Sequence, residues 1–259
     1  MNIKTIVKVM NFHALLRVDR ARRDAEQYAM LEREVMRMID LIQNNRNFIL
    51  DKRIFKTPKD APRLRIYLGS DMGFCGAVNA GMNHRLHEEN GENTVISVGR
   101  KIYGGDQVKL HLDQDEFIAR YGEISAIIGQ GVRHRRFSGV DLCYNHYYNL
   151  SRIEAVEKTI FPVEFEADEL ESYAEDFSVE GDDVNDIMEE LIITYLNYEV
   201  KIAAVNSFAA ENVLRQSATN DSLKKIEEME QEERWRLRKL QTQKAARKVI
   251  DSYVKSKWK

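Results

Sequence analysis

Residues 64–76 read LRIYLGSDMGFCG, a short apolar strand followed at once by a glycine-rich turn. The run without breakers suits a buried strand, and the glycines after it end that strand. Outward from this stretch, strand and helix patterns alternate over about 100 residues, which predicts a small, largely parallel, Rossmann-like α/β sheet. The further strands are expected at 94–98, 108–112, 140–144 and 154–162, and the helices at 75–88 and 116–128.

The segments on either side of this centre contain no glycine and no proline. All 3 prolines and 13 glycines of the 259-residue chain fall between residues 58 and 181. In residues 1–57, apolar side chains recur every three or four positions from Val7 to Ile42, and the same spacing recurs in residues 182–259. We therefore predict one long helix in each segment, reaching roughly 80 Å and 115 Å if unbroken.

Two long helices with one apolar face each need partners, and the simplest partner is the other helix. The predicted fold class is therefore α/β, with a long antiparallel coiled coil of the N- and C-terminal helices plus a central Rossmann-like α/β domain. Asp182 or Asp183 is expected to cap the second helix. Its apolar pattern thins at residues 231–234, where we expect the packing to change. The expected segments are a long helix at 1–57, the central domain at 58–165, an acidic connector at 166–183 and a long helix at 184–259.

Composition excludes several classes of protein. At 43% hydrophobic and 31% charged residues, with a net charge of −3, the chain is typical of a folded protein. No stretch approaches the roughly 18–20 apolar residues of a membrane span. Residues 1–16 have no long apolar core and no cleavage site, so we expect a helix there and no targeting segment.

Two other sequence features need an interpretation. Cys75 and Cys143 are too few for a disulfide framework or a four-cysteine metal site, so we expect buried free thiols. Residues 164–190 hold 13 acidic side chains and no basic one. We expect a solvated loop there, with a docking site for a basic partner as the alternative.

The glycine-rich turn at residues 69–76 is the clearest candidate for ligand binding. Backbone amides of such a turn can hold phosphate, but its spacing matches neither the dinucleotide fingerprint nor a P-loop. We expect a structural turn, with nucleotide binding as the alternative. Cys75 has no marked base, and His84 and His87 lack further ligands, so we expect no catalytic residue, no metal site and no cofactor.

Basic side chains gather at residues 17–23 and at residues 234–259, where ten basic residues accompany one acidic residue. The apolar pattern persists beside both clusters. A basic helix that meets acidic loops of a protein partner therefore explains the pattern best. Contact with nucleic acid or with an anionic membrane surface is the alternative.

Several motifs together resemble one known family. Residues 69–79, GSDMGFCGAVN, are similar to the Ser-Asp-x-Gly-Leu-Cys-Gly-x-x-Asn signature of the gamma subunit of F-type ATP synthases. Residues 6–10 resemble the Ile-Thr-Lys-Ala-Met stretch of its first helix, and residues 17–21 resemble its Lys-Leu-Arg-Arg-Ala stretch. Thr242 and Gln243 align with its Ile-Thr-Gln-Glu motif. The resemblance covers nearly the whole chain and is strong in the central signature.

This resemblance implies a non-catalytic rotor shaft that binds no cofactor. The coiled coil would turn inside a ring of three alpha and three beta subunits, with the α/β domain at the foot near the epsilon subunit and the ring of c subunits. Rotation would couple ion translocation in the membrane sector to ATP synthesis or hydrolysis. The complex would lie on the cytoplasmic face of a bacterial membrane or the equivalent interior face of an organelle. The chain would meet the membrane only through its partners and would bind no nucleic acid.

The chain departs from the family at several positions. The Arg-Gln pair that meets beta aligns with Leu237 and Arg238, and the Glu after Thr-Gln is Lys244. The Glu and Arg of the family's Ser-Glu-x-Ala-Ala-Arg are Ser207 and Glu211. Two alternatives therefore stay open: the shaft of a divergent F-type-like ATPase with another mechanical output, and a non-rotary coiled-coil adaptor. The contacts implied between the shaft and loops of beta are Lys8, Met10, Arg17, Arg20, Arg238, Thr242 and Gln243.

Overall fold

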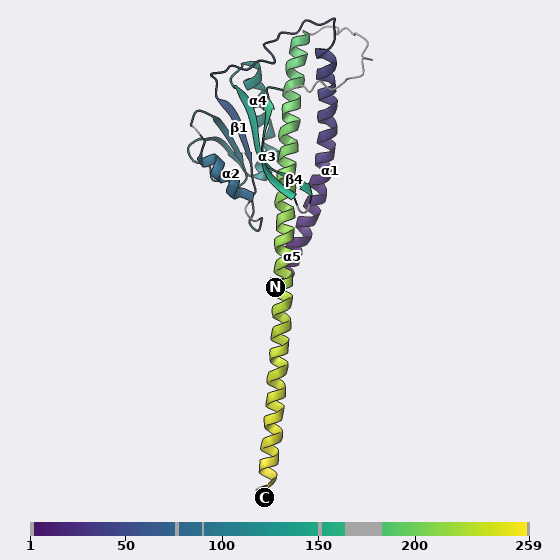
Figure 1. Cartoon of the computed structure of the whole chain (residues 1–259), viewed down its shortest axis with the longest axis vertical. Coiled ribbons are helices and arrows are strands. Elements are labelled where there is room, and N and C mark those ends of the chain that lie inside the picture. The colour runs from purple at the N-terminus through teal and green to yellow at the C-terminus, as the bar shows by residue number, and fades with distance from the viewer. Residues whose placement is uncertain (1–2, 76–77, 90, 150–151, 164–182, 258–259) are drawn as a thin grey trace.

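Two long helices form a rod, and an α/β domain lies against one side of it (Figure 1). The computed structural model describes residues 3–75, 78–89, 91–149, 152–163 and 183–257. The elements in chain order are α1 (Ile3–Gln43), β1 (Arg63–Leu68), α2 (Val78–His87), β2 (Thr94–Val98), β3 (Val108–Leu112), α3 (Gln114–Ala119), α4 (Tyr121–Arg133), β4 (Gly139–Asn149), β5 (Arg152–Phe161) and α5 (Val184–Lys257).

Helices α1 and α5 lie side by side and run in opposite directions (Figure 1). Lys4 near the start of α1 pairs with Glu230 of α5, with 2.9 Å between Nζ and Oε2. At the other end of the pair, the amide of Asp51 donates to Oδ1 of Asn185 at 2.8 Å. The predicted antiparallel pairing of the two long helices is confirmed.

The paired face of α1 uses small side chains where it approaches α5. Ala14, Val18 and Ala21 are buried, as the apolar spacing predicts. Nearer the end of α1 the helix packs into the core of the α/β domain, where Ile42 is buried as predicted but one other predicted position is not. Met38, which the spacing places on the buried face, is 50% exposed, whereas Ile39 is fully buried in that core.

The first helix is shorter than predicted. It ends at Gln43, and residues 44–57 form turns and irregular chain, so one helix across the whole segment is wrong. The amide of Asn45 donates to the carbonyl of Ile42 at 3.3 Å, and Oδ1 of Asn45 accepts from the amide of Asn47 at 2.8 Å. Asparagine side chains that bond their own backbone compete with the helix, so the chain turns here without glycine or proline.

The second helix begins where the sequence predicts. Oδ1 of Asp183 accepts from the amide of Asn185 at 2.9 Å, which caps the first turn. The other predicted cap, Asp182, lies outside the described residues, as does the acidic connector over residues 164–182. The helix then continues without a break through residues 231–234, and its 74 residues span about 110 Å.

The sheet has five strands in the order β3-β2-β1-β4-β5. The first four run parallel, and β5 pairs antiparallel with β4 at one edge. This agrees with the predicted Rossmann-like α/β domain, and β2 and β3 have the predicted bounds. Strand β4 is longer than residues 140–144, and the helix expected at 116–128 is two helices, α3 and α4, that meet at Arg120.

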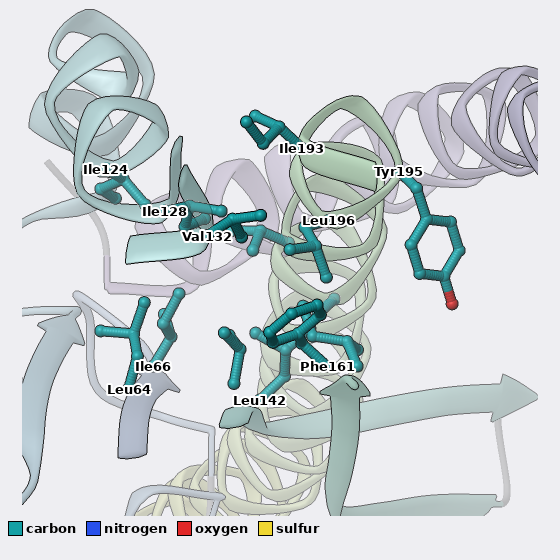
Figure 2. Packing of buried hydrophobic residues seen from close by; sticks show 14 of the residues in the cluster. Leu64, Ile66, Ile124, Ile128, Val132, Leu142, Phe161, Ile193, Tyr195 and Leu196 are labelled. Atoms are coloured by element: carbon teal, nitrogen blue, oxygen red, sulfur yellow. The ribbon is translucent and has the colours of Figure 1, made fainter. Parts of the chain in front are cut away.

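The core lies on the face of the sheet that α4 and α5 cover (Figure 2). Leu64 and Ile66 of β1 and Leu142 of β4 point into it and are fully buried. A smaller cluster on the other face lies under α2 and includes Tyr67, Met82 and the thiol of Cys143. The rod is therefore part of the domain's own core. Figure 2 shows Ile128 and Val132 of α4 and Leu196 of α5 in this core, with Ile193 of α5 on the side toward α4.

Both cysteines are free and buried, as predicted. Among the described helices, none is at once long and apolar enough to cross a membrane.

Candidate functional site

Helix α5 continues far beyond its pairing with α1. Lys4 contacts Glu227 and Glu230, and beyond these residues α5 has no neighbouring element in the described part of the chain (Figure 1). Every residue from 231 to 254 is exposed, a length of about 36 Å. We call residues 231–254 the projection. The predicted coiled coil is therefore correct for the first part of α5 and wrong for the projection, because α1 has 41 residues and α5 has 74.

The projection exposes apolar side chains among basic ones. Trp235 is 70% exposed and Val249 is 69% exposed, although large apolar side chains are normally covered. A single helix gains little stability from its own hydrogen bonds in water, so it needs packing from a partner. The projection thus has the surface of an interface. Its other exposed large apolar side chains are Leu237, Leu240, Ile250, Tyr253 and Val254.

The sequence-predicted contact residues spread along the rod and do not form one cluster. Lys8 is exposed and Met10 half-buried on the part of α1 that lies beside the residues of α5 just before the projection. Arg17 and Arg20 are exposed further along α1, and the Arg20 side chain is 82% exposed. The remaining three, Arg238, Thr242 and Gln243, are all exposed on the projection.

The glycine-rich turn after β1 is described over residues 69–75, which we call the signature loop. The amide of Gly69 donates to the carbonyl of Val98 at 2.8 Å, and the amide of Ser70 donates to Oδ1 of Asn79 at 3.0 Å. These amides are therefore already bonded within the domain. A phosphate cradle needs free amides, so these bonds support the structural turn over nucleotide binding.

One carboxylate of the signature loop ties together the turns that follow three parallel strands. Oδ1 of Asp71 accepts from the amide of Arg100 at 2.9 Å, and Oδ2 accepts from the amide of Gln114 at 3.1 Å. The loop then turns outward. Met72 is 48% exposed, and Phe74 is 65% exposed with a φ of 62°.

The other groups weighed for chemistry have ordinary surroundings. His84 is exposed and lies 3.3 Å from Glu88, measured between Nδ1 and Oε2. Among the described residues, no group of His, Cys, Asp and Glu side chains is arranged to hold a metal ion. Burial raises the pKa of the Cys143 thiol to about 12, so at neutral pH it is protonated and a poor nucleophile.

The sequence is similar to known ATP synthase gamma chains. A family model for ATP synthase matches residues 1–245. The ATP synthase gamma chain of Clostridium perfringens is 24% identical over 246 residues, which cover 88% of this chain and 83% of that protein. The ATP synthase gamma chain of Streptococcus thermophilus is 26% identical over 250 residues, which cover 87% and 83%.

The fold has a counterpart among solved structures. A chain from the central stalk and c-ring of the Tetrahymena thermophila mitochondrial ATP synthase superposes with a TM-score of 0.54. It is 17% identical, and the match covers 84% of this chain and 99% of that chain. This likeness is one of fold. Because the family model spans nearly the whole sequence and the relatives named above are gamma chains, the chain belongs to the gamma-chain family of ATP synthases.

Proposed function

We propose that this protein is the central rotor shaft of an F-type ATP synthase. The rod turns inside a ring of alpha and beta subunits, and its rotation couples ion translocation to ATP synthesis or hydrolysis. The α/β domain, which we assign to residues 58–165, forms the foot near the epsilon subunit and the c subunits. The acidic connector at 166–183 remains part of this proposal, and only Asp183 of it lies among the described residues.

The observation that carries this proposal is the projection. A helix that exposes Trp235, Leu237 and Val249 in water is covered in its working state. No element of the described chain reaches it, so the cover comes from other subunits. A ring closing around the projection would bury these side chains on all sides of the helix and meet its basic residues with acidic loops.

An asymmetric rod explains how a non-catalytic part can drive catalysis elsewhere. The ring sites are equivalent until the shaft gives each a different set of contacts. Such contacts shift the conformational equilibrium of each site by the difference in contact free energy between its states. As the rod turns, each site in the ring in turn receives the contacts that shift its conformational equilibrium.

The contact residues belong to this proposal. Lys8, Arg17 and Arg20 of α1 and Arg238 of α5 offer exposed positive charge to loops of beta. Met10, Thr242 and Gln243 add an apolar and two hydrogen-bonding contacts. The chain itself would have no catalytic site and would belong to a peripheral membrane complex on the cytoplasmic face in bacteria, or on the equivalent interior face of an organelle.

Co-expression with alpha and beta subunits tests the proposal. We expect one copy of the chain in each complex with three alpha and three beta subunits, and ATP-driven rotation of a probe fixed to the α/β domain. The isolated chain should show no ATP turnover. A homodimer that does not bind alpha and beta would support a non-rotary adaptor instead, and ATP hydrolysis by the purified chain would support an enzyme.

A further inference from the structure

Three polar side chains lie one turn apart on the face of α5 that meets the α/β domain. Ser207, Glu211 and Arg215 are 1%, 1% and 4% exposed. Their spacing of four residues puts them on one face of the helix. Polar groups so deeply buried need specific partners, and all three find them at the end of β1, in the signature loop or at the start of α3.

Each of the three is bonded across the interface. The hydroxyl of Ser207 donates to the carbonyl of Leu68 at 2.7 Å. Oε2 of Glu211 accepts from Nε2 of Gln114 at 2.6 Å. Nε of Arg215 donates to the carbonyl of Gly73 at 3.3 Å. The end of β1, the start of α3 and the signature loop are thus bonded to successive turns of α5.

The charges within this group are also paired. Nη2 of Arg215 donates to Oε1 of Glu211, and Nη1 of Arg215 donates to Oδ1 of Asn212 at 3.0 Å. Nε2 of Gln114 donates a second, longer bond of 3.4 Å to the carbonyl of Gly69. The desolvation free energy of a buried ion pair is about as large as the electrostatic free energy that the pairing provides. A fold with apolar side chains of equal volume at these positions would therefore be about as stable. Stability alone therefore does not account for a buried ion pair at this place.

The rest of the interface holds the domain to the rod in a different way. Leu142, Phe161 and Leu196 pack together in the apolar core (Figure 2). Apolar contact resists separation of the surfaces but has no preferred direction. Hydrogen bonds weaken steeply with distance and angle, and bonds to charged groups are the strongest. The hydrogen bonds of Ser207, Glu211 and Arg215 therefore oppose rotation of the α/β domain around the axis of α5.

We propose that Ser207, Glu211 and Arg215 form a latch that bears torque between the foot and the shaft. The inference rests on the proposed rotor function and assigns these three as positioning residues, since the latch acts by fixing the angle of the α/β domain relative to α5. Another ion pair across the same interface joins Lys158 to Glu199 at 2.8 Å; the Glu199 side chain is 6% exposed, but Lys158 is 45% exposed and therefore open to water. Water competes for such a pair and reduces its strength.

The test measures the angular stiffness of the rotor in the assembled complex. The alpha and beta ring is fixed to a surface, a bead is attached to the α/β domain, and the variance of the bead angle is recorded while the complex waits for ATP. The double variant Glu211→Leu with Arg215→Met keeps the volume and leaves no unpaired buried charge. We expect it to assemble with a thermal midpoint near wild type and to show about a twofold larger variance, because of the three bonds from the latch to the domain only that of Ser207 remains.

A milder variant and a matched control complete the design. Gln114→Ala removes the bond from the domain side, leaves Glu211 paired with Arg215, and should also raise the variance. Arg133→Ala removes an exposed ion pair to Glu190 that also links the domain to α5, and it should leave the variance unchanged. An assembled double variant with wild-type variance would overturn the latch alone. Absence of rotation with the wild-type chain would overturn the proposed function, and the latch with it.

Discussion

At the scale of single residues, Gly99 is a position where the backbone conformation requires glycine. Its φ is +114°, and a Cβ there would lie 2.8 Å from the carbonyl carbon of Gly69. Gly99→Ala should therefore lower the thermal midpoint, at a cost of roughly 2–3 kcal/mol from backbone strain and the clash together. Gly81→Ala is the control, since Gly81 lies in α2 with open space around it, and it should be neutral or stabilising. Equal midpoints for the two variants would contradict the argument.

Asp141 gives a residue-scale prediction about pH. Burial raises the pKa of this carboxyl, but hydrogen bonds from Arg63 and Thr159 outweigh burial and hold the pKa below its ordinary value. A lowered pKa stabilises the fold above the unfolded pKa, and that stability is lost as the pH falls through the folded pKa. Asp141→Asn should cost roughly 2–3 kcal/mol at neutral pH, at the low end for buried pairs because Arg63 is 33% exposed.

The difference between wild type and Asp141→Asn should shrink in urea titrations as the pH is lowered from about 7 to about 3. Glu154→Gln is the control, because this carboxyl pairs with Arg152 at the surface and its loss should change stability little at either pH. A constant difference between wild type and Asp141→Asn across the whole range would show that ionisation of Asp141 does not contribute.

At the scale of elements, α5 should behave as two segments. Amides of residues 235–254 should exchange with solvent roughly a hundredfold faster than those of residues 190–215 in the isolated chain, because the projection has no tertiary contacts to hold its hydrogen bonds. Hydrogen exchange read by mass spectrometry measures this directly. Binding of alpha and beta subunits should slow exchange in the projection and leave residues 190–215 unchanged. Equal protection of both segments in the monomeric chain would argue against the exposed projection.

The sequence predicts elements well where the local pattern causes them. Strands β2 and β3 have the predicted bounds because their apolar runs stop at turn residues. The end of α1 is missed, since Asn45 stops the helix through side-chain bonds to the backbone that a search for glycine and proline does not reveal. The division between α3 and α4 at Arg120 is also missed, and the capping box at Asp113 fixes only the start of α3.

Surfaces are harder to predict than elements. The apolar spacing through Leu237 and Leu240 is the same whether a partner helix lies in this chain or in another subunit, so the sequence alone does not show where the coiled coil ends. The latch residues, in contrast, could have been recognised in the sequence. Ser207, Glu211 and Arg215 interrupt an otherwise apolar face at a spacing of four, and polar residues on a buried face point to a specific bonded partner.

At the scale of the whole molecule, the shaft contacts can be tested by their effect on coupling. Replacing Arg238 or Lys8 with Ala should reduce torque, or ions moved per ATP, by about two- to fivefold, as expected when one surface charge pair is lost. Arg120→Ala is the control, because Arg120 lies outside both basic clusters, is 44% exposed and pairs with Glu123 within the α/β domain. Rotation assays on the reconstituted complex measure the effect. Wild-type torque in the Arg238 and Lys8 variants would remove both residues from the interface.

The exposed projection also determines how the cell must handle this protein before assembly. A newly made chain exposes Trp235, Leu237 and Val249 beside many arginines and lysines, so it is prone to non-specific association until it binds its partner subunits. Surplus copies would aggregate, or would be clipped by proteases at the unprotected helix while the α/β body stays intact. Synthesis of the chain therefore has to match synthesis of the subunits that enclose it. An exposed projection distinguishes unassembled copies from assembled ones.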